Sequence, residues 1–123
     1  MIKKRNSLKG KKSFSLLFKE GRRFRGVYIT VFTGNAGQWK NEGKITFAES
    51  DPLVGFSVSK RCGKAHERNR IKRRLRSVVR EFLPCIADNR MFIIKAADGI
   101  AAADFSAVRA EFEHLARKSG VIL

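Results

Sequence analysis

The side chains best suited to chemistry in this sequence are cations in residues 60–80, where ten basic residues stand against a single acid, Glu67. Arginine and lysine in such numbers neutralise phosphate groups, and the preference for arginine suits bidentate contacts with phosphate oxygens. Basic runs on helices are often only solvated faces, but such faces normally mix the two signs of charge. The stretch therefore predicts a phosphate-binding surface, with a solvated face as the alternative.

A helix from about Ala65 to Leu83 is expected to position these cations, because apolar residues from Ile71 to Phe82 recur along one side. At about 100° per residue, most of the cations fall on the opposite side, whereas Arg68 falls near the edge of the apolar stripe. The basic residues before the helix would meet its N-terminal amides, which favour phosphate. The candidate RNA-binding residues are Lys60, Arg61, Lys64, Arg68, Asn69, Arg70, Lys72, Arg73 and Arg76.

Four aromatic residues form a second candidate site: Phe14, Phe18, Tyr28 and Phe32 could line one surface between a first helix and a sheet. Exposed rings beside basic residues are what single-stranded RNA binding uses, since every base has a face on which a ring can stack. Any one of these rings could equally belong to the core. The strand pattern places Phe32 opposite the aliphatic residues of its strand, which favours an open aromatic surface.

The remaining reactive groups form no convincing catalytic or metal site. Cys62 and His66 are spaced as metal ligands on a helix could be, yet only Cys85 and His114 remain as partners, at no recognised spacing. The 11 acids are scattered, and none forms a pair of the kind that two-metal nucleases use. We therefore expect neither a catalytic residue nor a metal ion held by the protein.

Length and charge narrow the class of protein. The 123 residues fit one domain, residues 1–123, in which 1–12 are expected to form a basic, flexible arm. The net charge of +16 lies almost entirely in residues 1–25 and 60–80, which points to nucleic acid or an anionic membrane surface as partner. Two cysteines, no apolar segment after Met1 and no long apolar run predict a cytoplasmic protein with reduced thiols.

The hydrophobic pattern predicts an α+β fold, a single-domain αβββαβα sandwich with helices packed on a mostly antiparallel four-stranded sheet. The first helix would begin at an N-cap, Ser13, and stop at Gly21. In the first strand, residues 24–33, Val27, Ile29 and Val31 would face one way and Phe24, Tyr28 and Phe32 the other. The other expected elements are strands Lys44–Glu49, Val54–Ser59 and Met91–Ile94, the last buried on both faces, and a final helix between Asp104 and Gly120.

One continuous motif resembles the signature of the bacterial ribonuclease P protein component. It consists of Val54-Gly55-Phe56-Ser57-Val58-Ser59-Lys60-Arg61, then Gly63, then Arg68-Asn69-Arg70-Ile71-Lys72-Arg73. The opening Lys4-Arg5-Asn6, Phe14 and Phe18-Lys19-Glu20-Gly21 resemble the same family, as do the late Phe92-Ile93-Ile94 and Leu115-Ala116-Arg117-Lys118. The resemblance covers nearly the whole chain.

This resemblance implies a fold like that of the second domain of ribosomal protein S5, and a role as the protein subunit of ribonuclease P. In that family a large catalytic RNA, with Mg²⁺, removes the 5′ leader of precursor tRNA, so the enzyme activity belongs to the RNA. The Arg-Asn-Arg helix would lie against the catalytic RNA. A cleft between the first helix and the sheet would take the single-stranded leader, with Phe14, Phe18 and Phe32 in the positions of the family's cleft aromatics. His66 and Glu67 depart from the family pattern, which is often apolar or small there.

The expected partners are therefore the ribonuclease P RNA and precursor tRNA, with no membrane and no obligate protein partner. A general RNA chaperone or ribosome-associated protein is the first alternative, and it would share the charge but not need the aromatic cleft. A protein-only nuclease would need clustered carboxylates. A membrane-surface protein would need its apolar helix face exposed, whereas the core requires it here.

Overall fold

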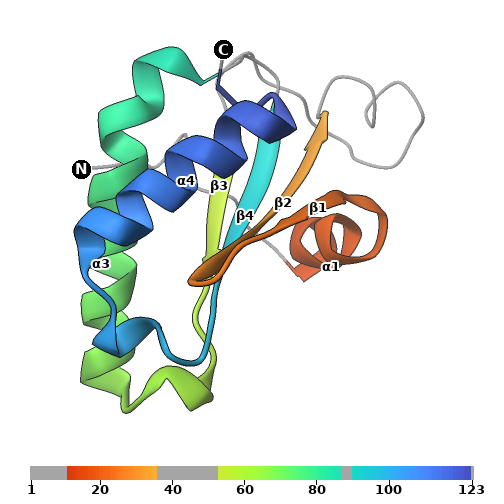
Figure 1. Cartoon of the computed structure of the whole chain (residues 1–123). Coiled ribbons are helices and arrows are strands. Elements are labelled where there is room, and N and C mark those ends of the chain that lie inside the picture. The colour runs from red at the N-terminus through yellow and green to blue at the C-terminus, as the bar shows by residue number, and fades with distance from the viewer. Residues whose placement is uncertain (1–10, 36–52, 87–89, 123) are drawn as a thin grey trace.

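The computed structural model describes residues 11–35, 53–86 and 90–122, and their order is the predicted αβββαβα (Figure 1). The elements are α1 (Lys11–Glu20), β1 (Arg22–Arg25), β2 (Ile29–Asn35), β3 (Leu53–Ser57), α3 (Ala65–Phe82), β4 (Arg90–Ala96) and α4 (Phe105–Ser119). None of the helices in these ranges is long and apolar enough to cross a membrane.

The four strands form one mixed sheet in the order β1-β2-β4-β3. β1 pairs antiparallel with β2, and β2 with β4, whereas β3 runs parallel to β4 and is joined to it through α3. The central β4 is buried on both faces, as its continuous apolar run predicted. Phe92 and Ile94 point into one core, and Met91 and Ile93 point into another.

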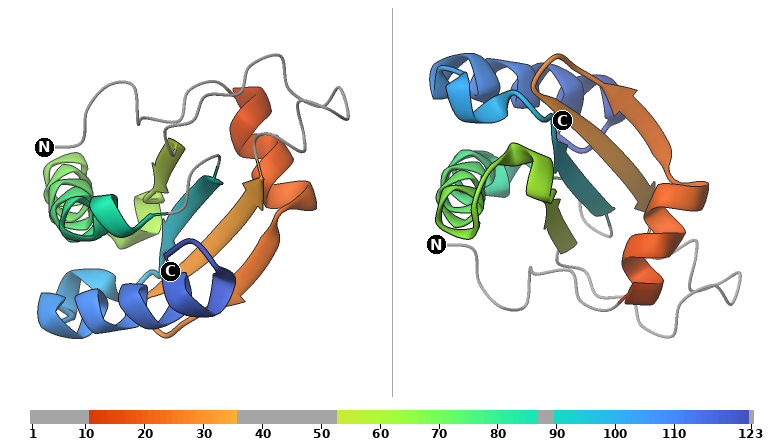
Figure 2. Two further views of the ribbon diagram at one scale, coloured as in Figure 1. Left: turned by 90° about the horizontal axis from the view of Figure 1, so that it is seen from above. Right: turned by 90° about the horizontal axis from the view of Figure 1, so that it is seen from below.

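The larger core lies between the sheet and the pair α3 and α4, which cover the same face (Figure 2). α3 contributes the predicted apolar stripe of Ile71, Leu75, Val78, Val79 and Phe82, all buried. α4 contributes its own stripe, in which Phe112 is fully buried and its ring lies 5.6 Å from that of Phe82 and 6.3 Å from that of Phe92. Burial of these stripes is the main reason that both helices lie flat on the sheet.

Of the helices that the structure describes, only α1 lies on the opposite face of the sheet, where it packs over part of it (Figure 2). Leu17 of α1 is fully buried there with Phe32, Met91 and Ile93. Because one short helix cannot cover a four-stranded sheet, the described residues leave the end of this face farthest from α1 open. The helices are therefore divided between the two faces.

The expected single strand over residues 24–33 is wrong, because the chain turns at residues 26–28 and forms a hairpin of β1 and β2. The turn shifts the alternation of side chains, so Phe24 and Tyr28 pack against the larger core on the same side as Ile29. Phe32 points to the α1 side, as predicted, and Val27 is 75% exposed at the turn.

The helix boundaries agree closely, with one correction. α1 begins at Lys11, so Ser13 lies inside the helix and does not cap it, and the expected arm of residues 1–12 is two residues too long. The rest of that arm and the expected strand Lys44–Glu49 lie outside the described residues. β3 spans Leu53–Ser57 where Val54–Ser59 was expected, with Val54 and Phe56 facing the core as predicted.

Asp104 caps α4 as predicted, since its carboxylate accepts a hydrogen bond of 3.0 Å from the Ser106 amide, and Gly120 ends the helix. This amide holds the pKa of the Asp104 carboxyl below its ordinary value. A carboxylate with a lowered pKa contributes stability at neutral pH and loses it as the pH falls through that pKa.

Candidate RNA interface

The start of α3 is capped by Glu67, one of the two residues that depart from the family pattern. Glu67, the single acid of the basic stretch, turns back so that its carboxylate accepts a hydrogen bond of 3.4 Å from the Lys64 amide. Gly63 adopts φ 134°, which side chains rarely allow, and a Cβ there would lie 2.9 Å from the Glu67 carboxylate. Glu67 therefore caps the helix and favourably meets its N-terminal dipole, and its charge serves the fold.

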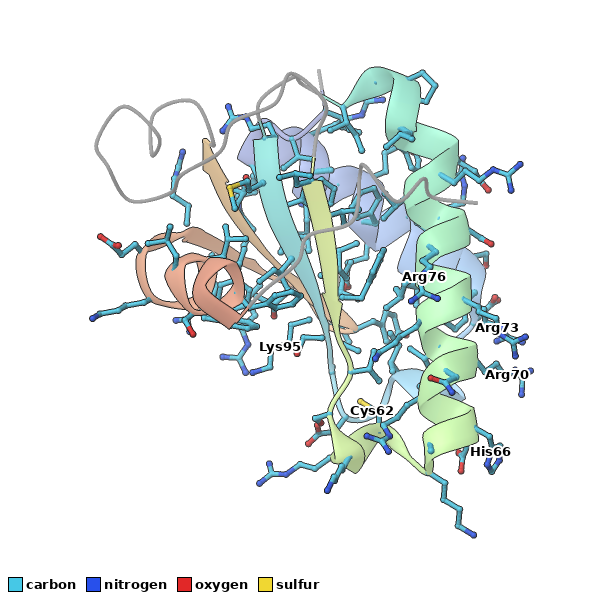
Figure 3. All side chains as sticks on the ribbon, turned by 180° about the vertical axis from the view of Figure 1, so that it is seen from behind. Cys62, His66, Arg70, Arg73, Arg76 and Lys95 are labelled. Atoms are coloured by element: carbon cyan, nitrogen blue, oxygen red, sulfur yellow. The ribbon has the colours of Figure 1, made fainter. Side chains whose placement is uncertain are left out.

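The polar face of α3 presents the predicted cations in several directions. Arg70, Arg73 and Arg76 are exposed, while Arg68 and Lys72 are half-buried along the margin of the apolar stripe. Among the residues that the structure describes, none of these five forms an ion pair. In Figure 3, Arg70 and Arg73 point outward from the helix, whereas Arg76 is turned toward the sheet.

Along the outer face of α3, His66, Asn69, Arg73 and Arg76 line a shallow hollow of about 470 Å³. These residues follow one another at spacings of three and four, so they form one row along the helix. The guanidinium of Arg76 lies 5.8 Å from the ring centre of Phe56 on β3, which holds it at the border between helix and sheet. A row of donors beside a hollow can follow an RNA backbone from phosphate to phosphate.

Arg68 occupies the boundary position that the helical pattern predicted. Its Nε is buried, yet this N–H has no hydrogen-bond partner among the residues that the structure describes. Buried donors are nearly always satisfied, and leaving one unpaired costs free energy. Arg68 is therefore a position whose hydrogen bonding is incomplete within the described residues.

The residues before α3 form a 3₁₀ turn, Lys60–Cys62, which lies against the end of β4. The Cys62 thiol is buried and lies 3.5 Å from the carbonyl oxygen of Ala97. Arg61 is 3.9 Å from the Asp98 carboxylate, with both side chains largely exposed. In the described parts of the chain, no three His, Cys, Asp or Glu side chains lie close enough to hold a metal ion together.

Three of the four predicted aromatic residues meet on the α1 side of the sheet. The ring centres of Phe14 and Phe18 are 6.4 Å apart, and those of Phe18 and Phe32 are 4.9 Å apart in an edge-to-face arrangement. Phe18 is 39% exposed, so one ring of the group is open to solvent. Tyr28 does not belong to this patch, because the turn at residues 26–28 places it on the other side of the sheet.

The strand register adds polar residues that the sequence analysis missed. Arg25 pairs with Thr30, Thr30 with Lys95, and Lys95 with Ser57, which gives a polar row across all four strands. The next row on the same face places Arg23 beside Phe32. Figure 3 shows Lys95 on the α1 side of the sheet.

This open face is concave, and the hollow in it measures about 380 Å³. Its lining residues come from β1, the turn after it, β2 and the end of β4. They are Arg23, Arg25, Gly26, Val27, Thr30, Phe32, Lys95, Ala96, Ala97 and Asp98. Lys95 was visible in the sequence as the single cation that interrupts the apolar run of β4. Arg23 and Arg25 were hidden because the hairpin was not anticipated.

The two surfaces therefore differ in composition but lie close together. The outer face of α3, with the turn before it, offers cations and Asn69. The open face of the sheet offers an aromatic patch (Phe14, Phe18 and Phe32) beside Arg23, Arg25 and Lys95. The Arg61–Asp98 contact joins the turn before α3 to the rim of the sheet hollow.

Comparisons with known proteins agree with this architecture. The solved structure of the Staphylococcus aureus RNase P protein matches 96% of this chain and 98% of its own, with a TM-score of 0.80 at 22% identity. The Thermotoga maritima RNase P protein matches 90% of this chain and 96% of its own, with a TM-score of 0.73 at 24% identity. At these identities the structures establish a common fold.

The family assignment follows from sequence. The ribonuclease P protein component of Acidothermus cellulolyticus is 32% identical over 118 residues, which cover 94% of this chain and 88% of that protein. Its counterpart from Lactococcus lactis subsp. cremoris (strain MG1363) is 33% identical over 120 residues, which cover 98% and 92%. The family model for ribonuclease P matches residues 2–120. The chain therefore belongs to the ribonuclease P protein family.

Proposed function

We propose that this protein is the subunit of a ribonucleoprotein ribonuclease P and that it binds two RNAs through two surfaces. The catalytic RNA binds the polar face of α3 and the turn before it. The single-stranded 5′ leader of precursor tRNA binds the open face of the sheet. The observation that carries the proposal is that one family member has two such surfaces: cations on α3 that lack acid partners among the described residues, and an exposed aromatic patch beside three further cations.

The surface on α3 supplies affinity for the catalytic RNA. Cations without acid partners bind phosphates and release the counterions condensed on RNA, so affinity falls steeply with salt. The unpaired Nε of Arg68 gains an acceptor in this process, and Asn69 offers hydrogen bonds that can distinguish one RNA group from another. Lys60, Arg61 and Lys64 extend the surface to the amino end of the helix.

The open face of the sheet supplies the leader site. A leader base stacks on Phe18, whose ring is braced edge-on by Phe32. The polar row of Arg25, Thr30, Lys95 and Ser57 then lies beside the aromatic patch and contacts leader phosphates and 2′-hydroxyls. A site of this composition accepts many leader sequences, because stacking is tolerant of base identity.

We assign the cleavage chemistry to the RNA, with Mg²⁺ as its cofactor. Support comes from the contacts that acidic side chains of the described residues already make. Three of them, Glu67, Asp104 and Glu111, accept hydrogen bonds from backbone amides, and three others pair with arginines. The cytoplasm is the expected compartment, since this is where precursor tRNA is transcribed.

The test is cleavage of a 5′-extended precursor tRNA at low Mg²⁺ concentration by the protein alone, by a bacterial ribonuclease P RNA alone, and by both together. We expect cleavage at the mature 5′ end only in the mixture. Cleavage by the protein alone would place the active site in this chain. A mixture no more active than the RNA alone would overturn the assignment.

A further inference from the structure

The turn between β1 and β2 is held by a residue on the far side of the sheet. Glu111, half-buried on α4, accepts hydrogen bonds of 2.9 Å from the Val27 amide and 2.8 Å from both the Tyr28 and the Ile29 amides. One carboxylate thus serves three successive backbone N–H groups. A carboxylate that accepts several amide bonds forms strong, charge-assisted contacts, and this one fixes the path of the chain through the turn.

Gly26, at the start of the turn, leaves room for this carboxylate. A Cβ on Gly26 would lie 2.4 Å from the Glu111 carboxyl group, so any side chain there would displace it. The Gly26 amide itself donates a hydrogen bond of 2.8 Å to the Ile29 carbonyl oxygen, which closes the turn. Gly26 and Glu111 therefore act as one unit, although they are far apart in the sequence.

The same turn forms one wall of the hollow on the open face of the sheet. Gly26 and Val27 line that hollow together with Arg23 and Arg25 of the strand that enters the turn. Val27 is 75% exposed and contributes little to the core, so the turn is not held in place by its own side chain. The backbone clamp from α4, together with the packing of Tyr28 against the larger core, sets the position of this wall.

We propose that Glu111 is a positioning residue for leader binding: it fixes the β1–β2 turn so that Arg23 and Arg25 face the leader. This inference rests on the proposed function, because it concerns the same open face of the sheet. Glu111 itself contacts no RNA. It acts through the backbone of residues 27–29, and its loss frees the turn without touching the outer face of α3.

The direction of the change in RNA affinity distinguishes a positioning role of Glu111 from a general effect of its charge. Replacing Glu111 by Gln raises the net positive charge by one, and charge alone would tighten RNA binding. Gln keeps one acceptor oxygen for the Tyr28 and Ile29 amides, but its NH₂ group would face the Val27 amide donor, so the clamp loses one bond and its charge. The proposal therefore predicts weaker leader binding from a more positive protein.

The experiment measures the affinity of the reconstituted holoenzyme for precursor tRNA with a long leader and with a leader of one nucleotide. The ratio of the two affinities is the leader gain. For Glu111→Gln we expect this gain to fall roughly tenfold, equivalent to one hydrogen bond to a charged group, with assembly on the catalytic RNA unchanged. Gly26→Ala should act alike, and the double variant should be no worse than either single one.

Two variants on α4 are the controls. Glu113→Gln makes the same change of charge two residues away, at a carboxylate that pairs with Arg117, and should retain the leader gain. Val108→Ala weakens the buried side of α4 without touching the turn and should lower the melting temperature while retaining the leader gain. Hydrogen exchange at the Val27, Tyr28 and Ile29 amides, protected in the parent, should become fast in Glu111→Gln.

The possible outcomes test the positioning role of Glu111 separately from the leader site on which that role depends. A parent holoenzyme with no leader gain would overturn the leader site itself. A parent with a leader gain that Glu111→Gln retains in full would refute the positioning role, as would unchanged exchange at the three amides. A loss of leader gain in Val108→Ala equal to that in Glu111→Gln would reduce the role of Glu111 to general stability.

Discussion

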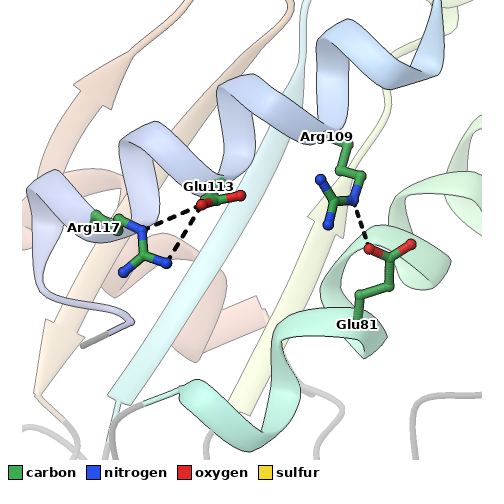
Figure 4. A network of polar contacts seen from close by, with 4 residues as sticks. All are labelled: Glu81, Arg109, Glu113 and Arg117. Atoms are coloured by element: carbon green, nitrogen blue, oxygen red, sulfur yellow. Dashed lines mark hydrogen bonds and ion pairs between the residues drawn. The ribbon is translucent and has the colours of Figure 1, made fainter.

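Helices α3 and α4 lie side by side on the same face of the sheet, and both bury an apolar stripe, but their polar faces differ (Figure 1). On α4, acidic and basic side chains form pairs within the fold. Arg109 bonds to Glu81 of α3 at 2.6 Å, and Arg117 pairs with Glu113 at 3.4 Å (Figure 4). Glu81 raises the pKa of Arg109, mainly through their hydrogen bond.

The polar face of α3 shows the opposite arrangement, since Arg68, Arg70 and Arg73 have no acid partner in the described parts of the chain. Like charges held on one helix repel, and an anion relieves this repulsion. We infer from this contrast that the charges of α4 are largely compensated within the fold, while those of α3 remain available to the RNA that we propose it binds. The contact between the two helices, which we call the seam, is closed by the Arg109–Glu81 pair. It lies at the edge of the RNA surface that we propose on α3.

The largest expected effect concerns the structural role of α4. Phe112→Ala removes a fully buried ring that contacts Phe82 and Phe92, and it should cost about 3–5 kcal/mol of folding free energy. Urea unfolding followed by circular dichroism measures this loss. If Phe112→Ala unfolded at the urea concentration of the parent, α4 would not be the structural member of the pair.

The second prediction concerns the polar face of α3. Arg68→Ala and Arg70→Ala should each weaken assembly with the catalytic RNA by about 2 kcal/mol, because each removes charge-assisted hydrogen bonds to phosphate. Filter binding at one fixed salt concentration measures this loss of affinity. Arg117→Ala on α4 is the matched control and should show only the small effect of one lost charge. Equal effects at Arg70 and Arg117 would erase the distinction between the helices.

The third prediction extends the comparison to the open face of the sheet. Phe18→Ala should weaken the binding of precursor tRNA with a long leader by about 1–3 kcal/mol, the value of one stacked base. Binding of mature tRNA and assembly with the catalytic RNA should not change, since Phe18 lies on α1, across the sheet from α3. A loss shared equally by both tRNAs would mean that Phe18 supports the fold and not the leader.

The smallest effect is expected at the seam. Glu81→Gln removes the partner of Arg109, and because both side chains are about half exposed, only a slight fall in melting temperature at low salt should result. The fall should disappear at high salt, where exposed pairs are screened. RNA binding should tighten slightly, because an acid beside the α3 surface is gone. A large loss of stability would show that the seam contributes more than its exposure suggests.

Much of this architecture was predictable because it follows from local rules. The stripe from Ile71 to Phe82 predicted the buried side of α3, and the continuous apolar run of β4 predicted a strand covered on both faces. Asp104 was recognised as a helix cap from its place before an apolar run. The segregation of charge into residues 60–80 predicted the RNA surface that we propose on α3, and the resemblance of the same segment supplied the family.

Other features depended on contacts between distant residues and were missed. Tyr28 was assigned to the aromatic patch because residues 24–33 alternate like one strand, yet the turn at Gly26 moves it to the other face. That turn is held by Glu111, which is more than eighty residues away. Lys95, Arg25 and Thr30 form a row only because three strands pair in one register.

The sequence by itself determined the helices, the buried central strand, the cations and the family, because helix periodicity, apolar runs and charge are properties of neighbouring residues. Only the tertiary structure decided on which face of the sheet each aromatic ring lies, which cations line the hollow, and what Glu67 and Glu111 do. The physical reason is that a carboxylate can accept hydrogen bonds from an arginine or from a backbone amide equally well. Which of these it meets is set by the packing of segments far apart in the chain.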